Sequence, residues 1–110
     1  MAYDEVLASR VEDLLGGRPD VTRRRMFGGL VWLVCGNMAI AVRGEGGLLV
    51  RIAPDDHDAM LAEAGTAAMV MRGRLMVGWI TVTPEACATP PDLARWVRRS
   101  LTYTRTLPPK

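Results

Sequence analysis

Residues 25–38 read Arg-Met-Phe-Gly-Gly-Leu-Val-Trp-Leu-Val-Cys-Gly-Asn-Met, and this stretch decides the expected fold. Two apolar side chains lead into the pair Gly28 and Gly29, an apolar run continues over residues 30–35, and Gly36 and Asn37 follow. Glycine marks places where the backbone must bend, and Gly-Asn suits a two-residue hairpin turn. The stretch therefore predicts a strand, a bend or bulge at Gly28 and Gly29, a second strand, a tight turn and a third strand.

The rest of the chain continues this pattern of strands and adds helices at both ends. Leu7, Val11, Leu14 and Leu15 form one apolar stripe, which predicts an amphipathic helix over residues 3–15. Thr89 followed by two prolines predicts the start of another helix, which extends to about residue 104. We expect a middle helix over residues 54–64, strands over residues 21–27, 30–35, 38–43, 48–52 and 76–82, and a short edge strand over residues 68–71.

Short connections force antiparallel neighbours, and grouped strands with flanking helices are typical of α+β proteins. We therefore expect a two-layer α+β fold, with a mainly antiparallel sheet of about five strands and three helices. The elements should follow the order helix, strands, helix, strands, helix. We expect a single domain over residues 1–110, because the chain shows no internal repeat or linker.

Charge and composition exclude little. The net charge is only +2, although 13 of the 14 basic residues are arginine, the exception being Lys110. No apolar run reaches the roughly 20 residues that span a bilayer, and the first residues do not resemble a signal peptide. We therefore expect a cytoplasmic protein that does not insert into membranes, with Cys35 and Cys87 as free thiols. Cys35 ends an apolar run and is expected to pack as a small hydrophobic residue.

The glycine-rich stretch and a few later residues resemble the N-terminal domain of the TfoX/Sxy competence regulators, over nearly the whole chain. This resemblance implies an antiparallel sheet with packed helices and no established catalytic residue. Full-length regulators of this family activate competence genes together with the cAMP receptor protein and carry a second, helical domain; this chain resembles the stand-alone copies. The resemblance rests mainly on Arg25, Met26, Phe27, Gly28, Gly29, Gly36, Asn37, Met38, Gly78 and Trp79.

Two groups of arginines are candidates for a partner surface or a nucleic-acid surface. The first is the run Arg23, Arg24 and Arg25, with Arg43 and Arg51 on neighbouring strands; the second is Arg95, Arg98 and Arg99 on the last helix. A basic face can contact phosphates. Exposed arginines also protect a strand edge or stabilise the end of a helix, and these interpretations are the ones we favour.

Other chemistry has weak support in the sequence. Asp55, Asp56, His57 and Asp58 resemble metal ligands, but adjacent residues at a helix start diverge around its axis. We expect no metal, no cofactor and no catalytic residue, since no nucleophile elbow or phosphate-binding loop is present. Met69, Met71 and Met76 could form an adaptable partner surface, although we favour core packing for them.

The sequence thus predicts a non-enzymatic regulatory or interaction module that acts through protein–protein contacts. Its partner would be another protein or a second copy of the chain. The alternative is a nucleic-acid-binding accessory factor that uses the arginine-rich strand and the last helix. The first hypothesis requires an exposed apolar or methionine-rich patch, and the second requires the two arginine groups to meet on one surface.

Overall fold

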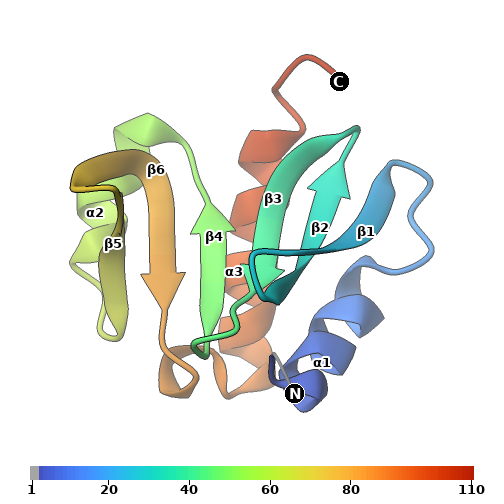
Figure 1. Cartoon of the computed structure of the whole chain (residues 1–110), viewed down its shortest axis with the longest axis horizontal. Coiled ribbons are helices and arrows are strands. Elements are labelled where there is room, and N and C mark those ends of the chain that lie inside the picture. The colour runs from blue at the N-terminus through green and yellow to red at the C-terminus, as the bar shows by residue number, and fades with distance from the viewer. Residues whose placement is uncertain (1–2) are drawn as a thin grey trace.

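Six antiparallel strands form one layer of the protein and three helices form the other, as shown in Figure 1. The computed structural model describes residues 3–110. The helices are α1 (Glu5–Leu15), α2 (His57–Leu61) and α3 (Pro90–Thr104), with short 3-10 helices η1 (Pro54–Asp56) and η2 (Glu85–Cys87). The strands are β1 (Val21–Met26), β2 (Gly29–Val34), β3 (Asn37–Val42), β4 (Leu48–Arg51), β5 (Thr66–Met71) and β6 (Arg74–Val82).

The strands follow the order β1-β2-β3-β4-β6-β5 across the sheet, and every neighbouring pair is antiparallel. The first four form a meander, and the β5–β6 hairpin joins it through β6. The predicted α+β fold, with three helices, is therefore confirmed. The sheet has six strands where about five were expected, because residues 66–71 form a full strand paired along β6.

Of the bend or bulge predicted at Gly28 and Gly29, the structure shows a bend: Gly28 lies in the turn of a hairpin, and Gly29 begins β2. Met26 pairs with Gly29, so Phe27 and Gly28 are the two residues of the turn, with φ angles of 55° and 76°. Positive φ at both central positions is the type I′ geometry, which matches the twist of the flanking strands. Gly28 accepts this conformation without a steric penalty, whereas Phe27 is one of the few residues other than glycine with a positive φ in this structure.

The second hairpin turn lies one residue earlier than predicted. Val34 pairs with Asn37, which leaves Cys35 and Gly36 in the turn, with φ angles of 50° and 84°. Cys35 is therefore exposed, and the expectation that it packs as a small hydrophobic residue was wrong. Asn37 instead begins β3, and its side-chain amide donates a hydrogen bond to the carbonyl of Pro108 (2.9 Å).

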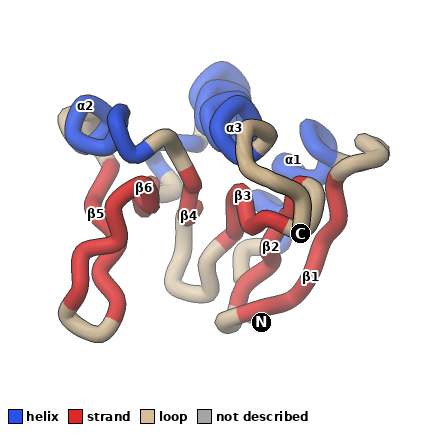
Figure 2. Tube along the Cα trace, turned by 90° about the horizontal axis from the view of Figure 1, so that it is seen from above, coloured by secondary structure: helices blue, strands red, loops and turns tan. Residues whose placement is uncertain are grey.

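All three helices lie on the same side of the sheet, as Figure 2 shows. Trp32 from β2 and Trp96 from α3 are the largest fully buried side chains of the core between these layers. Helix α1 buries Leu7, Ala8, Val11 and Leu15 on this core. Leu14 was expected in the same stripe but is partly exposed, because the stripe includes Ala8 in its place. We call the sheet surface without helices the open face.

Helix α3 begins and ends where the sequence predicted. The hydroxyl of Thr89 accepts a hydrogen bond from the backbone N–H of Asp92 (3.3 Å), which caps the helix. The middle helix is shorter than expected, since η1 covers residues 54–56 and α2 only residues 57–61. The Thr66 hydroxyl lies within hydrogen-bond distance of the carbonyls of Met60 in α2 (3.1 Å) and Glu63 just beyond it (2.8 Å), which ties the end of this short helix to β5.

Candidate interaction surface

The three arginines of β1 alternate between the two faces of the sheet. Arg24 pairs with Val31, a residue of the open face, and directly opposed residues of an antiparallel pair share a face. Arg23 and Arg25 therefore lie on the helix side, where Nη1 of Arg23 is 3.3 Å from Oε1 of Glu12 in α1. This ion pair anchors the edge strand to a helix.

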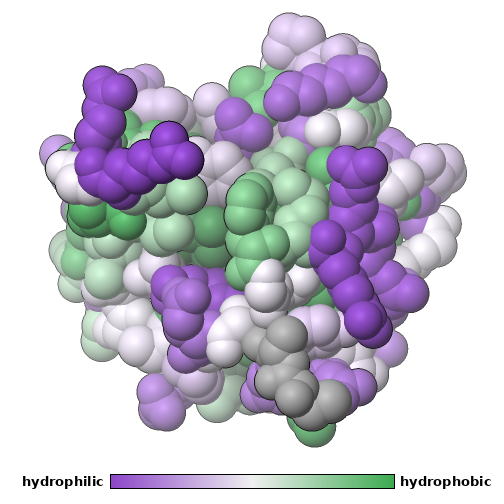
Figure 3. All heavy atoms as spheres, viewed as in Figure 1, coloured by the Kyte–Doolittle hydropathy of each residue, from purple (hydrophilic) through white to green (hydrophobic). Residues whose placement is uncertain are grey.

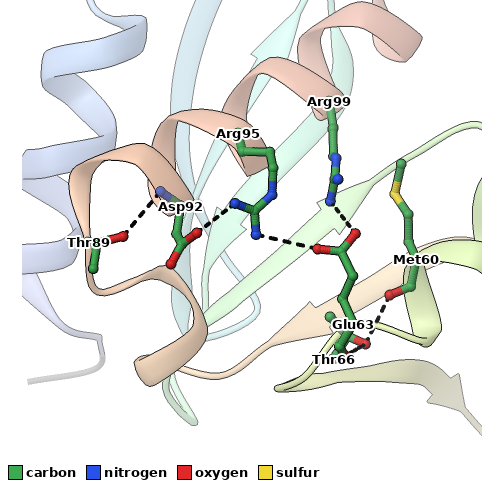
Figure 4. Close-up of polar contacts among 7 residues, drawn as sticks. All are labelled: Met60, Glu63, Thr66, Thr89, Asp92, Arg95 and Arg99. Atoms are coloured by element: carbon green, nitrogen blue, oxygen red, sulfur yellow. Dashed lines mark hydrogen bonds and ion pairs between the residues drawn. The ribbon is translucent and has the colours of Figure 1, made fainter.

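The arginines of α3 are held by carboxylates of the protein itself (Figure 4). Nη1 of Arg99 lies 2.7 Å from Glu63, in the segment between α2 and β5, and Nη2 of Arg95 lies 3.4 Å from the same carboxylate. Nη1 of Arg95 also donates to Asp92 (2.6 Å), and this hydrogen bond lowers the pKa of Asp92. Arg98 is exposed. Arg95 and Arg99 thus connect α3 to the segment between α2 and β5.

The two predicted arginine groups do not meet on one surface. Helix α3 lies behind the sheet, on the opposite side from the open face (Figures 1 and 2). A ligand bound at the open face can therefore reach Arg24, Arg43 or Arg51 but not the arginines of α3. The first group is itself divided between the two faces, since Arg23 and Arg25 lie on the helix side, so it does not present its five arginines together with those of α3 on one surface.

The open face carries an apolar groove of about 390 Å³. Val31, Ala41 and Leu49 form its floor, at the centre of the sheet. The β1–β2 and β5–β6 hairpins both extend away from the helices and stand on either side of this floor (Figure 2). Figure 3 shows hydrophobic side chains around a central hollow, with hydrophilic ones on both sides. Methionines dominate the lining, namely Met26, Met38, Met69, Met71 and Met76, so we call it the methionine groove.

Residues that carry the family resemblance gather at this groove. Met26, Phe27, Gly29, Met38 and Trp79 all line it, although they come from separate parts of the chain. Phe27 occupies the β1–β2 turn with 78% of its surface exposed, which is unusual for a phenylalanine. The motif therefore describes one surface of the protein as well as its turns.

Three arginines border the methionine groove, and we call them the arginine rim. Each is the cross-strand partner of a groove-lining residue: Arg24 of Val31, Arg51 of Trp79, and Arg74 of Met71. Within residues 3–110 none of the three forms an ion pair, whereas Arg43 at the groove pairs with Glu45. The guanidinium of Arg51 lies 5.0 Å from the Trp79 ring centroid and 6.0 Å from that of Tyr103 in α3, both cation–π distances, so this arginine sits where the open face meets the end of α3.

Charge is segregated between the strands and the rest of the chain. The six strands contain Arg23, Arg24, Arg25, Arg51 and Arg74 but no aspartate or glutamate. All 12 acidic residues therefore lie in helices, turns and loops. The net charge of +2 conceals this arrangement, which leaves the rim of the groove positive.

The prediction that Met69, Met71 and Met76 pack in the core was wrong, since all three line the groove. Met76 and Trp79 are three residues apart, and strict alternation would place them on opposite faces. Gly78, with a φ of 90°, interrupts the strand between them, so both reach the groove. Arg74 was not identified from the sequence, because its place on the rim depends on the pairing of β5 with β6.

The remaining candidates for chemistry are dispersed. His57 is buried, and its Nδ1 accepts a hydrogen bond from the backbone N–H of Gly78 (3.0 Å), so it supports the strand. Cys87 is buried, and burial raises the pKa of its thiol. Among the described residues, no three His, Cys, Asp or Glu side chains are grouped to hold a metal ion, and no helix could cross a membrane.

Comparison with known proteins gives one match. No curated protein and no solved structure matches the chain. The family model described as the TfoX N-terminal domain matches residues 13–103, which include the whole sheet and nearly all of α3. The chain therefore belongs to the TfoX N-terminal domain family.

Proposed function

We propose that this TfoX-like domain is a non-enzymatic regulatory module that binds another protein through the methionine groove. The observation that carries the proposal is the groove itself, an apolar surface on the face of the sheet that no helix covers. Contiguous exposed apolar surface is typical of sites where a partner binds. Methionine side chains are flexible and polarisable, so they adapt to the shape of a bound side chain.

The groove suits a protein partner better than a nucleic acid. Contacts to phosphates dominate the affinity of proteins for nucleic acids. The groove floor of Val31, Ala41 and Leu49 has no side-chain donor or positive charge that could bind a phosphate. Arg95 and Arg99, which the alternative would use, are held by Glu63 on the other side of the sheet. The three rim arginines without ion pairs are the feature that favours the nucleic-acid alternative, so the experiment must distinguish a protein partner from a nucleic acid.

Two free thiols support a reducing, cytoplasmic compartment for either function.

Site-specific photo-crosslinking in cells tests the proposal. A photoreactive amino acid replaces Phe27 or Met71 at the groove, and Thr102 on the exposed side of α3 serves as the matched control. We expect adducts from the groove positions only, sensitive to protease and resistant to nuclease. Nuclease-sensitive adducts would favour the nucleic-acid alternative. Equal adducts from both faces, or none from the groove, would refute a protein-binding role for this surface.

A further inference from the structure

On the basis of the protein-binding role above, we propose that the methionine groove receives an acidic amphipathic helix of its partner. The partner helix would place apolar side chains on the groove floor and carboxylates against the arginine rim. The proposal names the secondary structure, the charge and the apolar anchors of the bound segment. Each of these three properties follows from a different feature of the open face.

The helical form follows from the backbone chemistry of the site. The strands beneath the groove, β2, β3, β4 and β6, each have a neighbour on both sides, so their N–H and C=O groups are paired within the sheet. The face of the sheet offers side chains only. An extended segment buried there would leave its own backbone groups without partners, which is costly in an apolar site. A helix satisfies those groups internally and presents only side chains.

The acidic charge follows from the arginine rim. Arg24, Arg51 and Arg74 each stand beside a groove-lining residue, and no ion pair involving them is found within residues 3–110. The strands supply no carboxylate of their own. A partner helix with glutamate or aspartate beside its apolar stripe therefore complements the surface. Arg51 is already oriented, because its Nη1 donates to the carbonyl of Met38 (3.2 Å) and its guanidinium lies against Trp79.

The apolar anchors follow from the shape and the lining of the groove. Helices that bind in grooves insert side chains spaced at i, i+3, i+4 and i+7. A volume of about 390 Å³ lined by methionine, Val31 and Leu49 accommodates such anchors, and methionine adapts to leucine or methionine alike. The protein's own helices are poor candidates, because α1 and α3 already bury their apolar stripes against the sheet. Neither of these two helices is therefore free to fill the groove.

Designed peptides of about 18 residues, long enough to form a helix, test the proposal directly. The acidic probe carries leucine at i, i+3, i+4 and i+7, glutamate at the positions flanking this stripe and alanine elsewhere, because alanine favours the helix and glutamates four residues apart repel one another. Its controls are the same peptide with lysine for glutamate, a scrambled peptide without an apolar face, and the acidic peptide with a central proline. Binding is measured by anisotropy of a labelled peptide. Tryptophan emission reports on the groove, because Trp32 and Trp96 are at most 1% exposed and Trp79 lines it.

Two pairs of variants locate the site. Arg24→Glu with Arg74→Glu reverses the rim, and Arg18→Glu with Arg98→Glu makes the same change in net charge at exposed positions of the α1–β1 loop and of α3, away from the open face. Met71→Ser alters the groove, whereas Val70→Ser alters the neighbouring exposed residue outside it. We expect the rim pair to weaken acidic-peptide binding about tenfold and to gain binding of the lysine peptide. The control pair should change binding less than about twofold.

Other outcomes would overturn the proposal in distinct ways. Equal binding of the acidic and lysine peptides would refute the acidic partner, and equal binding of the scrambled or proline peptide would refute the helix. Both results leave the proposed function standing if groove positions still crosslink to protein. Displacement of the peptide by duplex DNA or single-stranded RNA would assign the surface to nucleic acid. A dimer in light scattering that Met71→Ser dissociates would assign it to a second copy of the chain.

Discussion

The adjacent residues Gly28 and Gly29 should respond differently to the same substitution by alanine. Gly28 has a φ of 76°, and a Cβ added there would meet nothing within 4 Å, so only backbone strain opposes the change. Strain in the left-handed region lowers the free energy of unfolding by about 1–2 kcal/mol. Alanine also reduces the conformational entropy of the unfolded chain, which raises the free energy of unfolding by about 0.4–1 kcal/mol. The expected net loss of unfolding free energy for Gly28→Ala is therefore about 1 kcal/mol.

Gly29 is constrained by space instead. A Cβ added there would press against the carbonyl oxygen of Val42, in the strand that pairs with β2. Neither backbone can move without breaking the pairing of β2 with β3, so we expect Gly29→Ala to cost about 3 kcal/mol, the upper part of the range for overpacking. For a domain of this size the total stability is about 5–15 kcal/mol, so this loss is large.

Urea unfolding followed by circular dichroism measures both values on purified protein. Gly28→Asn is the control, since asparagine tolerates positive φ in a type I′ turn and should cost less than Gly28→Ala. The reasoning is refuted if Gly28→Ala destabilises as much as Gly29→Ala. It is also refuted if Gly29→Ala leaves the urea midpoint unchanged.

Three further predictions concern the thiols, the pH dependence and a buried imidazole. Native protein should react with one equivalent of a thiol reagent at Cys35, while Cys87 reacts only after unfolding, because it is buried and burial raises its thiol pKa. The hydrogen bond from Arg105 lowers the pKa of Asp20, so its stabilisation exists above the ordinary carboxyl pKa and is lost as the pH falls towards the folded value. Arg105→Gln should therefore lower the thermal midpoint more at pH 7 than at about pH 2.5. His57→Ala removes the acceptor of a buried β6 amide and should cost about 1–3 kcal/mol in urea unfolding.

Features that depend on neighbouring residues were predictable from the sequence. Thr89, Pro90 and Pro91 define the start of α3 through local capping, and the structure places it there. The meander from β1 to β4 follows from short glycine turns between apolar runs. The error in the β2–β3 turn was also local. The turn consists of Cys35 and Gly36, where Gly36 and Asn37 were predicted, so the hairpin is shifted by one residue.

The methionine groove could not be predicted in the same way, because it depends on the order of strands that are distant in sequence. Met38 and Met76 reach the same groove only because β6 inserts between β4 and β5. The pairing of β5 with β6 is irregular between Ala68↔Ile80 and Val70↔Leu75, and Gly78 in this part of β6 changes which side chains face the groove. Core packing was favoured for Met69, Met71 and Met76 because methionine is an apolar residue that is most often buried.

The two edges of the sheet differ in a way that limits how copies of the chain could assemble. Edge strand β1 carries three consecutive arginines, whereas edge strand β5 (Thr-Ala-Ala-Met-Val-Met) carries no charge. Adjacent like charges oppose the pairing of one β1 with another, but nothing comparable protects β5. Two copies that paired through β5 would be related by a two-fold axis, and both outer edges of the combined sheet would be β1 strands. Pairing through β5 would therefore favour an assembly of two copies over further addition of one β1 edge to another.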